Sequence, residues 1–409
     1  MTAPAVHLVG ALDTKGVEYG FLRDRLRAAG LPVILVDTGV LDRPQLEAEV
    51  DRTAVADAGG ELLGDLQDRP DRNHAMQVMA AGAARIVSDR HARGLVSAVL
   101  AIGGSNAGFV MSRVAGALPI GVPKLLVSTI VAGDTRPYVG TSDLMMMYPV
   151  VDIAGLNSVS IPVLARAADA LIGILQAVPV PPRDGRIPVI GATMFGVTTG
   201  CVNAVQEKLE ADGAEVQVFH ATGTGGRSFE ALIRAGAFDA VADLTTTELA
   251  DELLGGVCSA GPDRLTAAAL VGIPQIVSPG AMDMANFGAR GTVPAWFADR
   301  LLLEHNPSVT LMRTSAEENA VLGRTMAERL NAAAGPVEVH IPALGFSQIA
   351  VEGAPFHDPV ADAAFIDGLR GALSPTIPVV IHDLDINAPA FAAAVHSALQ
   401  GIRTPHKKG

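Results

Sequence analysis

The residues best suited to chemistry lie in short loops that are rich in glycine and hydroxyl side chains. Each loop follows an apolar run that is typical of a buried strand. Glycines let backbone N–H groups approach an anion, and a helix that begins at the loop adds a favourable dipole. Such loops therefore suit a phosphate or a carboxylate. Seven of them occur, at residues 10–16, 37–39, 103–108, 128–134, 193–199, 221–227 and 245–248.

The loop at residues 222–227 offers the most complete set of groups for an anion. An arginine beside a glycine turn can bind a phosphate through two parallel hydrogen bonds. The alternative is a surface arginine next to a flexible turn. The loop reads Thr222, Gly223, Thr224, Gly225, Gly226 and Arg227, which supply backbone donors, two hydroxyl groups and a guanidinium.

Three other loops supply further candidates for contacts to the same ligand. Asp13 and Lys15 flank Thr14 in the first loop and would help to close the site, although Lys15 could instead only solvate a helix start. Any one of these loops could also be an ordinary tight turn between a strand and a helix. The remaining candidates are Gly103, Gly104, Ser105, Thr246 and Thr247.

Two residues are candidates for a general base, namely His220 and Asp13. His220 ends an apolar run just before the loop at residues 222–227, and the alternative for it is a structural histidine with satisfied hydrogen bonds. Cys201 follows a turn, but no base can be assigned to it. We therefore expect Cys201 to be a buried packing residue and not a nucleophile.

Metal ligands are scarce in the sequence. Glu248, together with Asp251 and Glu252, could hold Mg²⁺ through water, or could form the acidic first turn that helices favour. The histidines show no spacing that is typical of a zinc site, so we expect no dedicated transition-metal site.

Composition excludes several classes of protein. The chain has 409 residues with a formal net charge of −13, which argues against nucleic-acid binding because that needs a basic surface. No apolar stretch reaches the roughly 20 residues that span a bilayer, and no export signal is visible at the start. The two cysteines provide no disulfide framework. We therefore expect a cytoplasmic protein that does not bind membranes.

The chain resembles itself in order, which predicts two copies of one α/β unit. Residues 9–39 resemble residues 190–223, with Gly10 and Gly39 opposite Gly191 and Gly223, and residues 121–128 resemble residues 272–278. A proline-rich stretch at residues 179–185 is typical of a linker. The sequence therefore predicts two Rossmann-like domains with parallel sheets, residues 1–184 and 185–409, related by internal duplication. We expect the ligand in a cleft between them.

Apolar runs and helical periodicity predict the individual elements. A strand, a helix and a strand within about thirty residues form a βαβ unit, which requires parallel strands. The more polar residues 41–72 predict loop and short helix. We expect strands at residues 6–9, 33–36, 95–102, 124–127, 187–190, 215–219, 240–244, 275–277, 309–312, 337–341 and 377–381, and helices at residues 17–29, 73–92, 158–178, 316–333 and 389–399.

Several unusual strings, taken in order, resemble one known family. They are residues 11–16 (ALDTKG), 151–157 (VDIAGLN), 193–199 (TMFGVTT), 219–227 (FHATGTGGR), 243–248 (DLTTTE) and 305–307 (HNP). The family is the uncharacterised, mostly bacterial group similar to the ATP-binding N-terminal region of the plant tobamovirus-resistance (RNA replication inhibitor) protein. The resemblance covers nearly the whole chain.

This resemblance implies a nucleotide site for ATP and a homodimer. In the plant protein the region precedes a barrel-like domain, so a separately encoded barrel-domain protein is an expected partner. Our first hypothesis is therefore an ATP-binding protein, with ATP alone or with Mg²⁺ as its ligand, whose cellular role the sequence does not assign. The second is an enzyme, a hydrolase or a lyase, that acts on a small phosphorylated or carboxylate metabolite with His220 or Asp13 as the base.

Overall fold

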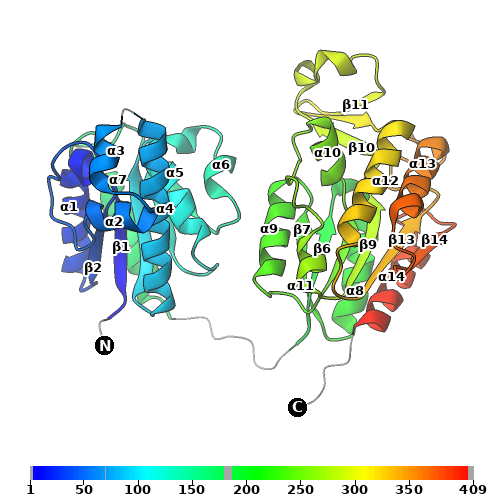
Figure 1. Cartoon of the computed structure of the whole chain (residues 1–409), viewed down its shortest axis with the longest axis horizontal. Helices are drawn as coiled ribbons and strands as arrows, with labels where there is room; N and C mark the ends of the chain where they lie inside the picture. The colour runs from blue at the N-terminus through cyan, green and yellow to red at the C-terminus, as the bar shows by residue number, and fades with distance from the viewer. Residues whose placement is uncertain (1–2, 70, 179–186, 404–409) are drawn as a thin grey trace. The chain divides into compact units, whose positions relative to one another are not determined.

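The computed structural model describes residues 3–69, 71–178 and 187–403. The chain forms two compact units, an N-terminal unit of residues 1–182 and a C-terminal unit of residues 183–409 (Figure 1). The expected boundary at residues 184 and 185, like the proline-rich linker, lies outside the described residues. Each unit is an α/β fold built on a parallel sheet, as the sequence predicts. The cleft expected between the two domains stays a prediction.

The N-terminal unit contains a five-stranded parallel sheet with the order β2-β1-β3-β4-β5. Its strands are β1 (Ala5–Gly10), β2 (Val33–Asp37), β3 (Val96–Gly103), β4 (Lys124–Ser128) and β5 (Met145–Met147). Its helices are α1 (Leu12–Ala28), α2 (Arg52–Gly59), α3 (Leu63–Asp68), α4 (Arg72–Ala92), α5 (Ser105–Gly116), α6 (Arg136–Val139) and α7 (Ser160–Gln176), with the 3₁₀ turn η1 (Thr129–Ala132).

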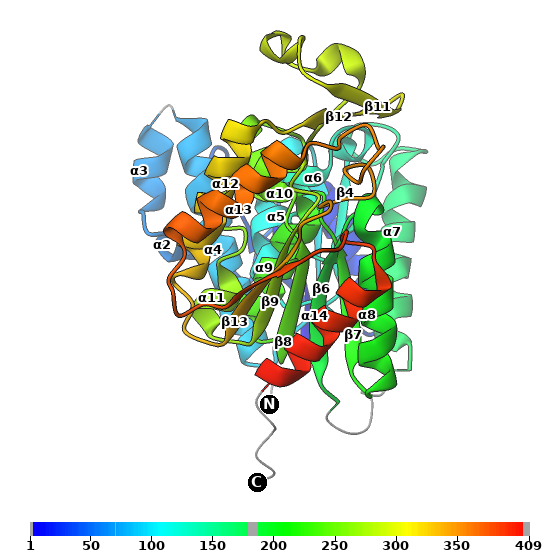
Figure 2. The same ribbon diagram turned by 90° about the vertical axis from the view of Figure 1, so that its right-hand side faces the viewer.

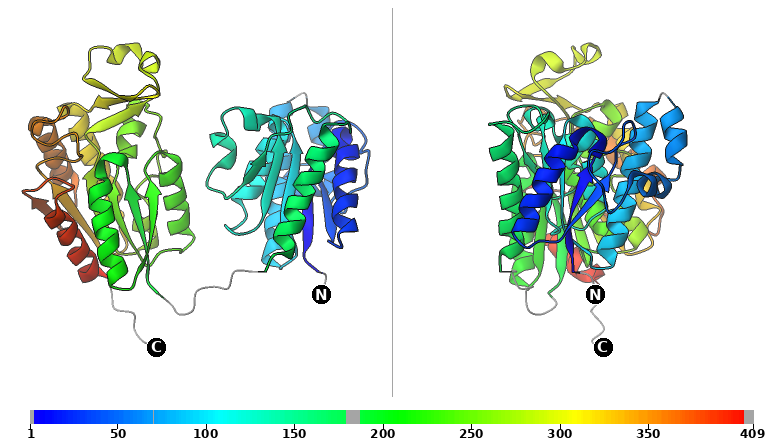
Figure 3. Two further views of the ribbon diagram at one scale, coloured as in Figure 1. Left: turned by 180° about the vertical axis from the view of Figure 1, so that it is seen from behind. Right: turned by 90° about the vertical axis from the view of Figure 1, so that its left-hand side faces the viewer.

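Helices cover both faces of this sheet, because alternate strand residues point to opposite faces and nearly all are apolar. On one face α1 and α7 pack on residues such as Leu8 and Leu100, and Figure 3 shows these two helices side by side. On the other face α2, α4 and α5 pack on residues such as Val9 and Val99. The sheet is therefore doubly wound, and ligands of such folds bind beyond the carboxyl ends of the strands.

The C-terminal unit repeats this arrangement. Its parallel sheet has the order β7-β6-β8-β9-β13-β14, so the first four strands in sequence have the same spatial order as β1 to β4. The strands are β6 (Val189–Met194), β7 (Glu215–His220), β8 (Ala240–Thr245), β9 (Gln275–Gly280), β13 (Val337–Pro342) and β14 (Val379–His382). The helices are α8 (Thr199–Ala211), α9 (Thr224–Arg234), α10 (Glu248–Leu254), α11 (Ala267–Val271), α12 (Ala316–Leu330), α13 (Pro359–Ala372) and α14 (Pro389–Ile402), with the short turn η2 (Gly196–Thr198) before α8.

Segments that match in the predicted repeat form strands at the same place in the two sheets, but paired glycines do not always take the same place within those strands. Residues 121–128 and 272–278 lead into β4 and β9, which occupy the same place in the two sheets. Gly10, by contrast, ends β1, whereas Gly191 is the third residue of β6. The two glycines make room for different side chains. A Cβ on Gly10 would lie 1.9 Å from the Tyr19 hydroxyl, and one on Gly191 would lie 2.7 Å from the Phe229 ring.

The strand expected at residues 309–312 lies outside the main sheet. It is β12 (Val309–Arg313), the middle strand of a separate antiparallel sheet with β10 (Met284–Phe287) and β11 (Leu302–Asn306). This sheet, with the turns η3 (Arg290–Thr292) and η4 (Ala295–Phe297), extends beyond one end of the parallel sheet (Figure 2). Within the described residues, no helix combines the length and apolar character that a membrane span requires.

Candidate functional site

The strand order of the N-terminal unit changes direction between β1 and β3, since the chain passes from β1 to β2 on one side and from β3 to β4 on the other. The side chain of Tyr19 lies at this point. Its fully buried hydroxyl donates to Val9 O at 2.6 Å and accepts from Ile102 N at 3.0 Å. Tyr19 thus joins the ends of β1 and β3 where their mutual hydrogen bonding has stopped. Crevices at such a reversal are the usual ligand sites of doubly wound folds.

A pocket of about 350 Å³ opens at this reversal. The loop after β1, the loop after β3, the loop at residues 38–41 and the starts of α4 and α5 line it. One part of its wall is apolar, with Leu66, Met76, Met79 and Val110. Five residues that the sequence analysis selects meet here, namely Asp13, Lys15, Gly103, Gly104 and Ser105.

The N-terminus of α5 faces this pocket with free backbone donors. Gly104 is its first flanking residue, and no described side chain caps the helix. Gly103 has φ of +146°, which other residues rarely adopt, and it lets the chain turn directly from β3 into α5. Ser105 and Asn106 are exposed. An uncapped helix start of this kind favours an anion through its N–H groups and its dipole.

The start of α1, by contrast, is already occupied by a carboxylate. Asp37, at the end of β2, accepts hydrogen bonds from Leu12 N at 3.0 Å and from Gly39 N at 2.9 Å. Burial raises the pKa of Asp37, and these two backbone donors oppose that rise. The start of α4 is capped as well, by the Asp71 side chain, which accepts from His74 N at 3.0 Å. Of the three helix starts beside the pocket, the α5 start is therefore the one open to a ligand anion.

Three cationic side chains line the same pocket. The ammonium group of Lys15 donates to Ile153 O, so its position is set by residues after β5. Arg69 lies 3.4 Å from a carboxylate oxygen of Glu61, and its side chain is 57% exposed. Arg72, the first residue of α4, has no ion pair among the described residues. The pocket therefore combines positive charge, an open helix start and an apolar wall.

The loop at residues 222–227 is in a different situation, because a carboxylate of the protein itself lies in it. Oε1 of Glu248 accepts from Gly223 N at 2.7 Å and from Gly226 N at 3.0 Å. The close approach needs a glycine, since a Cβ on Gly226 would lie 2.1 Å from Glu248 Oε2. The carboxylate of Glu248 thus occupies the backbone donors at the start of α9 that the sequence predicts for a phosphate.

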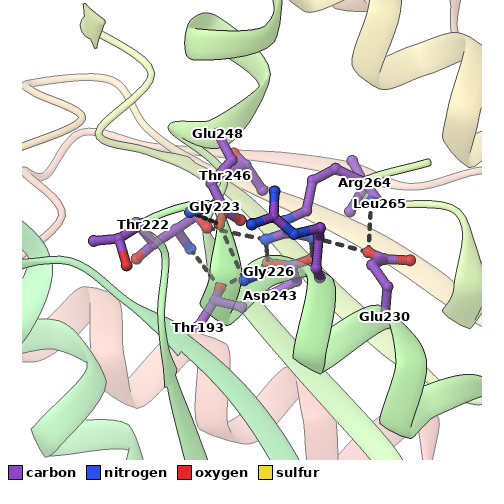
Figure 4. Close-up of polar contacts among 12 residues, drawn as sticks. Thr193, Thr222, Gly223, Gly226, Glu230, Asp243, Thr246, Glu248, Arg264 and Leu265 are labelled. Carbon is purple, nitrogen blue, oxygen red and sulfur yellow. Dashed lines mark hydrogen bonds and ion pairs between the residues drawn. The ribbon is translucent and has the colours of Figure 1, made fainter. Parts of the chain in front are cut away.

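Arg264 holds this carboxylate together with two others (Figure 4). Its fully buried guanidinium contacts Glu248 at 2.6 Å, Asp243 at 2.5 and 2.6 Å, and Glu230 at 3.2 Å. Burial alone would lower the pKa of Arg264, but the carboxylates, Asp243 foremost, raise it well above its usual value. Glu248 is fully buried, so it has no open position for Mg²⁺ in this arrangement.

The remaining candidates of the C-terminal unit also make internal contacts. Thr246 and Thr247 are buried, and their hydroxyls donate to Ser278 O at 3.0 Å and to Met284 O at 3.3 Å. Arg227 donates to Ser259 O at 3.1 Å and to the Thr224 hydroxyl at 3.3 Å.

His220 and Cys201 have different surroundings in the same unit. His220 is exposed, and its ring stacks on Phe195 with the ring centres 5.5 Å apart. Cys201 is buried, and burial raises the pKa of its thiol to about 12, as expected of a packing residue. The described residues contain no group of three or more His, Cys, Asp or Glu arranged to hold a metal ion.

Asp251, the second acidic residue of α10, leads to a prediction about pH. It accepts from Asn286 Nδ2 at 2.7 Å and from Cys258 N at 3.0 Å, and burial raises its pKa to about 7. The folded state thus binds a proton more tightly than the unfolded state. Stability from this group is complete below about pH 4 and is lost as the pH rises towards 7, at about 1.4 kcal/mol per pH unit.

We expect the neutral variant Asp251→Asn to remove the loss of stability that accompanies rising pH. Asn286 Oδ1 has no partner among the described residues. The side-chain amide of Asn286 can therefore flip, so that its Oδ1 accepts a hydrogen bond from the amide group of the new asparagine. Melting curves at pH 5.5, 7 and 8.5 should show that the melting temperature of the variant increases relative to that of the wild type as the pH rises. Glu252→Gln, at the exposed neighbouring position, is the control. Parallel pH profiles for wild type and Asp251→Asn would contradict the assignment.

Several residues in the pocket of the N-terminal unit and around Glu248 in the C-terminal unit were not predicted from the sequence. Arg69 and Arg72 lie near and at the end of the polar stretch of residues 41–72, which predicted only loop and short helix. Tyr19 lies in the predicted α1, and the only signal for it was a lone tyrosine within an apolar helix face. Arg264 stands in an irregular segment, and no local pattern marks it as buried.

Two family models match this chain. The N-terminal domain of the Uncharacterised protein family (UPF0261) matches residues 4–179, and its C-terminal domain matches residues 187–403. A UPF0261 protein from Clostridium tetani is 45% identical over 393 residues, which are 96% of this chain and 97% of that protein. One from Mesorhizobium japonicum is 43% identical over 97% of this chain and 99% of its own length.

A plant relative and a solved structure complete the comparison. The ToMV resistance protein Tm-1(GCR237) of Solanum lycopersicum is 36% identical over 96% of this chain, which is 55% of the tomato protein. A UDP-N-acetylglucosamine 2-epimerase from Rickettsia bellii aligns with a TM-score of 0.24 and 9% identity over 67% of this chain and 79% of its own. A structural similarity that low supports no conclusion about function.

Proposed function

This chain belongs to the Uncharacterised protein family (UPF0261), and we propose that its N-terminal unit binds a nucleotide, with ATP as the first candidate. The observation that carries the proposal is the pocket at the reversal of strand order, where an uncapped helix start and Arg72 face an apolar wall. Phosphates would bind at Gly104, Ser105 and Arg72, and the base would lie against Met76 and Met79. Mg²⁺ would enter with the triphosphate.

Titration calorimetry with ATP, with and without Mg²⁺, tests this proposal on the full chain. We expect Arg72→Ala to weaken ATP binding by about tenfold or more, because a hydrogen bond to a charged group contributes roughly 1.5–3 kcal/mol. Arg227→Ala is the matched control, since its guanidinium contacts Ser259 O in the other unit, and it should bind ATP like the wild type.

The two variants also separate the alternative sites. Loss of ATP binding in Arg227→Ala, with binding retained in Arg72→Ala, would move the site to the loop at residues 222–227. Absence of binding by the folded wild type at millimolar ATP would reject the nucleotide. The expected homodimer, the barrel-domain partner and the cytoplasmic location stay predictions beside this proposal.

An enzyme acting on a small phosphorylated or carboxylate metabolite is the second candidate. The observation in its favour is that Asp13, one of the two proposed bases, shares the pocket with Lys15 and Arg72, whereas His220 belongs to the other unit. Steady formation of ADP from ATP, with a pH dependence that disappears in Asp13→Ala, would favour the enzyme. Binding of ATP without turnover would favour the binding protein.

A further inference from the structure

One acceptor atom of a residue that lines the pocket has no donor among the described residues. Asp13 is 7% exposed, and its Oδ2 accepts from Leu41 N at 3.1 Å, but its Oδ1 is buried and has no hydrogen-bond partner among the described residues. Leaving a buried acceptor unsatisfied costs about 1–3 kcal/mol, and more when the group is charged. Such a group in a pocket calls for a donor that the protein does not supply.

The carboxylate of Asp13 is held firmly in this position. The Gln45 side chain donates to the backbone oxygen of Asp13 at 2.9 Å. Gly39 lies so close that a Cβ there would be 2.7 Å from Asp13 Cγ, so the loop at residues 38–41 packs directly on the carboxyl group. This loop also lines the pocket. The carboxyl group of Asp13 is therefore part of a closely packed wall of the pocket.

Several nearby donors of the protein are directed to other groups. Lys15, two residues away, donates to Ile153 O. The amides of Leu12 and Gly39 both donate to Asp37. In the part of the chain that the structure describes, no ion pair joins Asp13 to Lys15, Arg69 or Arg72. Among those residues, Asp13 therefore has no ion-pair partner on the α1 side of the pocket, although Lys15 lies nearby. The α5 start, Arg69 and Arg72 supply positive charge elsewhere in the pocket, beside Asp71, whose carboxylate caps α4 by accepting from His74 N at 3.0 Å.

A ligand that fits this charge pattern needs a phosphate for α5 and an uncharged donor for Asp13. A phosphate beside Asp13 would be repelled, because both groups are anions. A hydroxyl group donates a hydrogen bond without adding charge. In dinucleotide-binding doubly wound folds a carboxylate about 20 residues beyond the first turn accepts from a ribose hydroxyl, so a carboxylate can take this role, although Asp13 lies in the first turn itself.

We infer that Asp13 accepts a hydrogen bond from a sugar hydroxyl of the bound nucleotide and so selects ligands with an intact ribose. The inference rests on the proposed function, since it concerns the same pocket. It assigns the phosphates to the α5 side and the sugar to the α1 side. Asp13 is thus a specificity-determining residue for a ligand with both groups.

Calorimetric titration with ATP and with 2′,3′-dideoxy-ATP, in EDTA and again with Mg²⁺, tests the inference. We expect the wild type to bind ATP at least tenfold more tightly than the dideoxy analogue in both buffers. Asp13→Asn and Asp13→Ala should bind the two nucleotides alike, at the level of the wild type with the analogue. Asp24→Asn, an exposed change on the same helix, is the control and should keep the wild-type preference.

Each other result has a separate meaning. Equal binding of both nucleotides by the wild type would overturn the inference and leave the nucleotide site standing. A preference that appears only with Mg²⁺ would also overturn it and assign Asp13 to the metal. Absence of any ATP binding would reject the proposed function and this inference together. The melting temperature of Asp13→Asn checks folding, because the amide oxygen can still accept from Leu41 N.

Discussion

Arg264→Ala should destabilise the C-terminal unit by about 3–5 kcal/mol or prevent its folding. Its guanidinium is the only cation in ion-pair distance of Asp243 and Glu248 among the described residues. Both carboxylates are buried, and Glu230 beside them is 3% exposed. Removing one partner of a buried ion pair leaves an uncompensated charge, which is the costly case. Differential scanning calorimetry of the full chain measures the effect.

Two further variants make this prediction specific. Arg234→Ala removes a half-exposed arginine that lies 4.0 Å from Glu230, and it should change stability by less than about 1 kcal/mol. Arg264→Lys keeps the charge but not the planar guanidinium that contacts three carboxylates. Its loss of stability should therefore lie between the losses of Arg234→Ala and Arg264→Ala. An unchanged melting profile in Arg264→Ala would show that the carboxylates find other partners or protons.

Tyr19→Phe should destabilise the N-terminal unit by about 2–4 kcal/mol. The change removes one oxygen that serves two buried backbone groups, Val9 O at 2.6 Å and Ile102 N at 3.0 Å. Each group left without a partner costs about 1–3 kcal/mol. Burial raises the pKa of Tyr19, which is consistent with a hydroxyl that stays protonated. Calorimetry should show the loss in the transition of the N-terminal unit.

The pocket provides an independent readout for the same variant. Val9 O and Ile102 N flank the strand ends that form the pocket floor, so ATP binding should weaken together with stability. Tyr148→Phe, at a residue that is 45% exposed, is the control and should alter neither. A Tyr19→Phe protein with wild-type stability would mean that water replaces the hydroxyl between the two strands.

Much of the fold was accessible from the sequence because it depends on local pattern. Apolar runs of three to eight residues marked the parallel strands except β5, whose three methionines were not predicted as a strand. The helix predicted at residues 316–333 begins at Ala316, with Ser315 as its cap. The six strands of the C-terminal parallel sheet were all predicted. β10 and β11 were not, because their residues (MANF and LLEHN) show neither a long apolar run nor the strict alternation of a half-buried strand.

Parallel sheets bring the loops after their strands to one edge. Residues in those loops could therefore be selected as candidates from the sequence alone. Asp13, Lys15 and Gly103 were selected in this way, and they share one pocket. Arg72 was not selected because it belongs to no such loop. It reaches the pocket from the start of α4, a placement that depends on how α4 packs on the sheet.

The sequence by itself determined that this is a duplicated parallel α/β protein with glycine-rich turns after its strands. Only the tertiary structure decided which turn is open to a ligand. The turn at Gly223 and Gly226 accepts Glu248, which is 25 and 22 residues away and is held there by Arg264. The start of α5 has no such internal anion among the residues that the structure describes. Both turns look alike in sequence, because backbone N–H groups are the same everywhere and the group that satisfies them comes from a distant part of the chain.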